Sequence, residues 1–74
     1  MAREIKVLSD LGGVVWAVEV SPGQAVNEGD TLIVLESMKM EIPIAAPCAG
    51  TVAQILVESS QIVDEGQLVA RLER

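Results

Sequence analysis

Lys39 is the residue of this chain whose surroundings most strongly suggest chemistry. It is the only basic residue between Lys6 and Arg71, and it stands in the run Glu36-Ser37-Met38-Lys39-Met40-Glu41 near the middle of the sequence. We interpret Lys39 as a covalent attachment point that the rest of the chain presents. The alternative is an ordinary solvated lysine on a turn, with the flanking methionines in the core, which is the commoner fate of methionine.

Other kinds of reactive site lack their residues. The chain has no histidine, and Cys48 is its only cysteine. Zinc sites of the Cys/His type and triads that use histidine are therefore excluded. The sequence also lacks a glycine-rich phosphate loop followed by Lys-Ser/Thr. We expect no metal site and no intrinsic catalysis.

Composition limits the fold and the partners. The chain has 74 residues, of which 50% are hydrophobic, and Trp16 is its only aromatic residue. This length predicts one domain, residues 1–74, with an aliphatic core. The net charge of −6 disfavours nucleic acid and anionic membranes, and it serves solubility or complementarity to basic patches on partner enzymes. No apolar run reaches membrane-spanning length and no signal peptide is visible, so we expect a cytoplasmic protein.

The apolar pattern indicates strands separated by turns. Turn residues cluster at 9–13, 21–23, 27–30, 58–61 and 64–66. The segments between them are rich in β-branched residues, and we expect strands at 4–8, 14–20, 31–37, 40–44, 51–57 and 67–72. Pro43 predicts an edge or a bulge in its strand. No window has the 3.6-residue period of a helix.

An internal repeat indicates how these strands are arranged. When the chain is shifted by 37 residues, Gly13–Glu36 falls on Gly50–Glu73, and nine of the 24 pairs are identical. Neither copy is long enough to bury its apolar face alone, so we expect the two to pack face to face in a pseudo-two-fold all-β domain.

The repeat also places Lys39. The lysine falls just after the first copy, whereas the matching place in the second copy is the C-terminus. We therefore expect the Lys39 hairpin at one end of the domain and both termini at the other. A two-residue hairpin loop favours Asn-Gly or Gly-x, because its residues take positive φ, and Met38-Lys39 departs from this rule. Such departures occur mostly at functional sites.

The run 36–41 resembles the attachment motif of biotinyl/lipoyl attachment domains, in the Met-Lys-Met form of biotin carboxyl carrier proteins. The resemblance covers nearly the whole chain, including the turns at 26–30, 46–50 and 64–66. It implies a flattened barrel-sandwich of two four-stranded antiparallel sheets, with the attachment lysine on a hairpin turn. The two copies align without a gap, which leaves no room for the protruding thumb of some bacterial carriers. Small stand-alone attachment proteins are the most similar type.

The resemblance further implies a non-catalytic carrier of covalent biotin. A biotin protein ligase would join biotin to Lys39. A biotin carboxylase would then carboxylate the ring with ATP and bicarbonate, and a carboxyltransferase would pass the carboxyl group to an acceptor such as an acyl-CoA. Met38 and Met40 would serve as flanking recognition residues. Further contacts for the ligase would come from Glu36, Ser37 and Glu41.

Two alternatives remain open. Lipoyl domains usually carry Asp-Lys-Ala, so Met38 favours biotin. Some small attachment proteins accept both groups, however, which keeps open a lipoyl or dual carrier for an oxidative dehydrogenase or glycine-cleavage system. The other alternative is an unmodified structural barrel-sandwich domain, which leaves Lys39 and its flanks unexplained.

Overall fold

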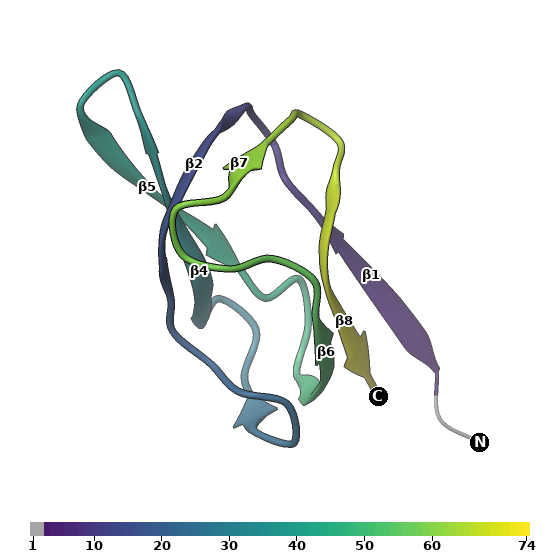
Figure 1. Cartoon of the computed structure of the whole chain (residues 1–74). Helices are drawn as coiled ribbons and strands as arrows, with labels where there is room; N and C mark the ends of the chain where they lie inside the picture. The colour runs from purple at the N-terminus through teal and green to yellow at the C-terminus, as the bar shows by residue number, and fades with distance from the viewer. Residues whose placement is uncertain (1–2) are drawn as a thin grey trace.

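The computed structural model describes residues 3–74, and residues 1 and 2 of the expected domain lie outside the described part. The described chain contains eight strands and no helix (Figure 1). Their bounds are β1 Glu4–Leu8, β2 Gly13–Val18, β3 Ala25–Val26, β4 Thr31–Ser37, β5 Met40–Ala45, β6 Gly50–Ile55, β7 Ile62–Val63 and β8 Leu68–Glu73.

The strands form two antiparallel four-stranded sheets, which confirms the expected fold class. One sheet has the order β1-β8-β6-β3 and the other has the order β5-β4-β2-β7. Each sheet is built mainly from one copy of the repeat and contains one short strand from the other copy. β3 of the first copy pairs with β6 of the second, and β7 of the second copy pairs with β2 of the first. The two copies therefore pack face to face as expected, and they are also interlocked through these two short strands.

Several strand ends differ from the sequence-based expectation. β2 and β6 each begin one residue earlier and end two residues earlier than expected. Val20 and Val57, which had been assigned to these strands, are buried without being strand residues. Burial rather than strand pairing explains their apolar character. β3 and β7 were not expected as separate strands, because a two-residue strand is too short to show an alternating pattern.

The two copies of the repeat share backbone details as well as sequence. Gly29 and Gly66 are equivalent and have φ of 90° and 82°. In the first copy the Asn27 N–H donates a hydrogen bond to Asp30 Oδ2 at 2.8 Å, and in the second the Asp64 N–H donates to the side chain of Gln67 at 3.0 Å. The expected pseudo-two-fold symmetry thus extends to individual turns.

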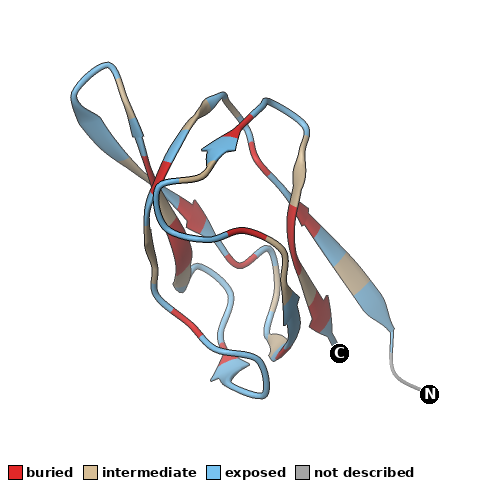
Figure 2. Ribbon diagram, viewed as in Figure 1, coloured by how far each residue is buried: buried red, intermediate tan, exposed pale blue. Residues whose placement is uncertain are grey.

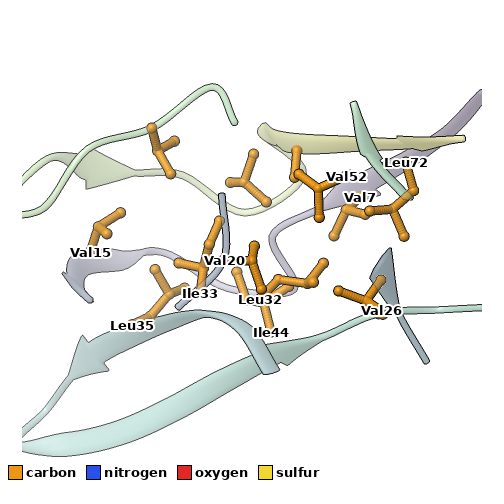
Figure 3. Packing of buried hydrophobic residues seen from close by; sticks show 14 of the residues in the cluster. Val7, Val15, Val20, Val26, Leu32, Ile33, Leu35, Ile44, Val52 and Leu72 are labelled. Atoms are coloured by element: carbon orange, nitrogen blue, oxygen red, sulfur yellow. The ribbon is translucent and has the colours of Figure 1, made fainter. Parts of the chain in front are cut away.

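The core lies between the two sheets and is wholly aliphatic (Figure 3). Both sheets contribute fully buried side chains, including Leu32, Ile33, Leu35, Val52 and Leu72. Trp16 is absent from this core and is exposed on β2. The described residues include no helix long and apolar enough to cross a membrane.

The long shape of the domain separates the β4–β5 hairpin from the chain ends. The principal extents are 40 × 18 × 17 Å. In Figure 1 the hairpin projects at one end, while the described N-terminal segment and the C-terminus lie near each other at the opposite end. Arg3 and Arg74 are joined there by backbone hydrogen bonds of 3.1 and 2.9 Å. This is the layout that the repeat predicts.

Candidate functional site

The attachment hairpin is a two-residue turn between β4 and β5. Its last cross-strand pair is Ser37 with Met40, so Met38 and Lys39 form the whole loop. Both residues have positive φ, 52° for Met38 and 65° for Lys39. Two positive φ values are the mark of a type I′ turn, which matches the twist of the flanking strands. The hairpin therefore keeps a favourable turn geometry while carrying two residues that glycine or asparagine would suit better.

The side chains at the tip are turned out into solvent. Met38 is 92% exposed, Met40 is 64% exposed, and Lys39 between them is also exposed. The tip is correspondingly coloured as exposed in Figure 2. The interpretation of both methionines as core residues is therefore wrong. Their location at the tip leaves them free to contact a protein that approaches Lys39.

Two carboxylates stand opposite one another just below the tip. Glu36 pairs with Glu41 across the hairpin, and both are exposed. Ser37, half-buried, lies between this pair and the loop. Like charges placed directly across a strand pair destabilise it. The hairpin thus accepts an unfavourable pair of negative charges next to the attachment residue.

The stem below the tip is anchored by the core. Leu35 on β4 is fully buried, and Ile44 on β5 is 6% exposed. Figure 3 shows Leu35 close to Val15 of β2, at the end of the core nearest the hairpin. Pro43 lies on β5, which is an edge strand of its sheet, where a residue without a backbone N–H is tolerated. A firmly packed stem therefore holds a tip that is open to solvent.

Lys39 lines none of the shallow hollows found on residues 3–74. Shallow hollows on the surface are lined by other parts of the chain, for example by Glu19, Thr31 and Val34, or by Glu4, Gln54 and Arg71. Among residues 3–74, the one ion pair found joins Arg71 to Glu4 at 2.7 Å, far from the tip in sequence. No cluster of three potential metal ligands is found in the described part of the chain. The arrangement can offer an amine to another protein.

The sequence analysis missed an exposed apolar group on the same sheet. Val14, Trp16 and Ile62 are all exposed large hydrophobic residues of β2 and β7. The sequence contains a clue to these residues, because the equivalent positions in the other copy of the repeat hold small or polar residues. It was not recognised because β7 was not expected as a strand.

Comparison with known proteins identifies the family. The family described as "Biotin-requiring enzyme" matches residues 5–72. The chain belongs to this family.

Relatives of similar length and relatives of much greater length both match the chain. A protein described as "Biotinylated protein TB7.3 homolog" from Mycobacterium leprae is 39% identical over 95% of this chain and 96% of its own length. The "Biotin/lipoyl attachment protein" of Bacillus subtilis is 37% identical over 84% of this chain and 85% of its own. The human mitochondrial propionyl-CoA carboxylase alpha chain is 43% identical over 88% of this chain, which spans only 9% of that protein.

Solved structures agree with the fold. The urea carboxylase of Kluyveromyces lactis superimposes with a TM-score of 0.90 at 31% identity, over 95% of this chain and 6% of that one. A single-chain, multi-domain long-chain acyl-CoA carboxylase also gives 0.90, at 34% identity, over 96% of this chain and 7% of that one. As a member of this family, the chain is a biotin carboxyl carrier domain, similar to the biotinyl domains of carboxylases, and biotin is favoured over lipoate.

Proposed function

We propose that the Lys39 amine is covalently biotinylated, and that the domain carries a carboxyl group between a biotin carboxylase and a carboxyltransferase. The observation that carries this proposal is the geometry of the tip. Lys39 stands on a two-residue turn at positive φ, exposed and at the far end of the domain from the described termini. A tethered group needs an amine that is clear of the domain body, and this position meets that need.

The attachment step uses the lysine as a nucleophile. The attack needs the free amine, so a biotin protein ligase has to accept the proton that leaves the Lys39 nitrogen. The amine then displaces AMP from biotinyl-adenylate, which the ligase makes from biotin and ATP. The products are an amide at Lys39 and AMP. Met38 and Met40 supply soft apolar contacts to the ligase, and Glu36, Ser37 and Glu41 supply polar ones.

The carrier role assigns the catalysis to partner proteins. Attached biotin supplies a ring that accepts and gives up a carboxyl group, and the domain supplies reach and a high local concentration. We therefore infer a non-catalytic carrier whose partners are a ligase, a biotin carboxylase and a carboxyltransferase, in the cytoplasm.

Lipoate is the second candidate for the attached group. The similarity to a protein named "Biotin/lipoyl attachment protein" supports it, whereas Met38 in place of the usual aspartate argues against it. The mass added to Lys39 in the native host distinguishes the two groups. We expect an intact mass raised by one biotin, with the modification mapped to the peptide that contains Lys39.

Reconstitution tests the carrier role. The biotinylated chain alone should be inert with ATP, labelled bicarbonate and an acyl-CoA. Addition of a biotin carboxylase should label the chain, and addition of a matching carboxyltransferase should pass the label to the acceptor. If the isolated chain carboxylates a substrate by itself, the carrier assignment fails.

A further inference from the structure

The outer face of the β5-β4-β2-β7 sheet carries an unusual group of apolar residues. Val14, Trp16 and Ile62 are 39%, 55% and 73% exposed. Val34 of β4 is half-buried, and Pro43 of β5 is exposed beside it. These five residues are called the apolar face below. Of the six exposed large hydrophobic residues found in the described chain, all except Leu8 lie on this sheet or its hairpin.

Strand pairing makes this face continuous with the attachment hairpin. Ile62 pairs with Val14, Val14 pairs with Glu36, and Glu36 pairs with Glu41. One row therefore runs straight across four strands, from the apolar residues to the two carboxylates. Lys39 lies two residues from Glu41, just beyond the Ser37–Met40 pair, so it is at most about 7 Å along the hairpin from this row at ~3.3 Å per residue. Whatever holds Lys39 in an active site is therefore close to this face.

The repeat supplies an internal control for the meaning of the apolar face. The equivalent positions on the other sheet hold small or polar residues. They are Thr51 for Val14, Ala53 for Trp16, Arg71 for Val34, Lys6 for Pro43 and Ala25 for Ile62.

The backbone at these equivalent positions is the same. β2 has an irregularity between Val15 and Ala17, and β6 has one between the matching residues Val52 and Gln54. On β8, Arg71 instead bonds to Glu4 and Gln54 in a polar surface. The fold therefore does not need apolar residues at these positions. The presence of apolar residues on one sheet alone points to contact with another molecule.

The size of the tip also requires a wider contact. A stable protein interface buries about 800 Å² on each partner, whereas the whole chain exposes 4639 Å². A loop of two residues is too small to supply such an area alone. A partner that accepts the tip through an interface of standard size extends down the hairpin onto the sheet, where an exposed tryptophan is of a residue type enriched at interface hot spots.

We propose that the apolar face is the docking surface for the biotin carboxylase, with Trp16 seated in an apolar pocket of that enzyme and Glu36 and Glu41 meeting basic residues at its rim. This inference rests on the proposed function. The choice of partner follows from charge, because an active site that holds both ATP and bicarbonate needs a positive mouth, and the carrier has a net charge of −6. A second copy of this chain fits less well, since the same carboxylates would face each other.

Trp16→Ala tests the proposal, and the repeat provides its matched control. Ala53 shows that alanine fits the equivalent position, so the Trp16→Ala chain should fold and accept biotin at Lys39 as the parent does. With fully biotinylated chains, we expect the kcat/KM of the carboxylase to fall about tenfold or more, mainly through KM, as for loss of an aromatic anchor. Ala53→Trp should behave as the parent. The double variant Trp16→Ala/Ala53→Trp, with the indole moved to the other sheet, should remain as defective as Trp16→Ala.

Charge gives a second readout of the same surface. Glu36→Gln/Glu41→Gln should raise KM and flatten its dependence on salt, because screened charge pairs contribute less as ionic strength rises. Glu73→Gln, at the position on the other sheet that corresponds to Glu36, should leave the salt dependence unchanged.

Four results would overturn the inference, and each is separable from failure of the carrier role. The first is carboxylation of Trp16→Ala with parental KM. The second is rescue of that variant by Ala53→Trp. The third is slow biotinylation of Trp16→Ala followed by normal carboxylation, which would assign the face to the ligase. The fourth is self-association of the parent chain that Trp16→Ala abolishes in sedimentation measurements. If the parent chain itself is never carboxylated, the proposed function fails instead.

Discussion

Gly13 of β2 lies directly against the backbone carbonyl of Glu36, in the strand that leads to the attachment hairpin. A Cβ atom at Gly13 would stand 2.9 Å from the Glu36 oxygen, closer than real Cβ atoms approach. The equivalent Gly50 would meet the Glu73 oxygen at 2.5 Å. In both copies of the repeat, two strands approach this closely because one of them lacks a side chain at the contact.

Gly13→Ala should therefore destabilise the domain. The atoms in conflict are backbone atoms of β4, so the strand has to shift, and we expect a loss of about 1–3 kcal/mol in the free energy of unfolding. Urea unfolding followed by circular dichroism measures it. Gly12→Ala is the control, because its Cβ would meet its nearest atom, the Val63 oxygen, at 3.5 Å. Equal stability of the two variants would show that the close approach does not constrain the fold.

Lys39→Arg should abolish biotin incorporation without changing the fold. The guanidinium keeps the positive charge but stays protonated, so it is no usable nucleophile. Incubation with a biotin ligase and a streptavidin blot measures incorporation. Lys6→Arg, which changes the only other lysine, should label as the parent does. A labelled Lys39→Arg chain, with biotin mapped to Lys6, would disprove the assignment.

Met38→Gly should make the domain more stable and a poorer ligase substrate. Glycine adopts the φ of 52° found at Met38 without steric cost, and we expect a gain of about 0.5–1 kcal/mol. Met40→Gly is the matched control, because this residue lies in β5 rather than at positive φ. It should lose about 0.5–1 kcal/mol. Chemical denaturation measures the stability gain expected for Met38→Gly and the loss expected for Met40→Gly. The initial rate of biotinylation measures how far Met38→Gly impairs the domain as a ligase substrate.

Conservative changes of the methionines separate recognition from packing. Met38→Leu and Met40→Leu should leave stability nearly unchanged, since both side chains are exposed. They should still slow biotinylation or carboxyl transfer, because leucine lacks the flexible thioether. A stability loss of several kcal/mol in either variant would instead assign that residue to the core.

Leu35→Ala and Leu72→Ala should be similarly and severely destabilising. The two leucines are equivalent in the repeat, and both are fully buried. Removal of a buried leucine side chain costs about 2–5 kcal/mol, a large part of the stability of a small domain. Thermal unfolding measures both variants, with Ile62→Ala as an exposed control that should change little. A large difference between the two leucines would show that the copies contribute unequally to the core.

The sequence by itself was sufficient for the local features. Lys39 stood out because no other basic residue lies near it, and the repeat located its hairpin opposite the chain ends. The alternation of apolar residues identified the six longer strands, since period two is a local property of a half-buried strand. The two-residue length of the Met38-Lys39 loop predicted positive φ at the tip, although neither residue favours it, and the backbone has positive φ at both. Residues within a few positions of one another determine the strands and the turn, and the repeat is visible in the sequence without knowledge of the fold.

Only the tertiary structure decided which strands pair across the two copies of the repeat and which faces of the sheets are exposed to solvent. β3 and β7 exist because residues far apart in the sequence pair across the two copies, and two residues carry no periodic signal of their own. Val20 and Val57 read as strand residues, yet they are buried outside the strands. Trp16 could have been core or surface by its type. Its exposure follows from the orientation of β2 in the sheet, because the side chains of Val15 and Trp16 point to opposite faces and only one face meets the core.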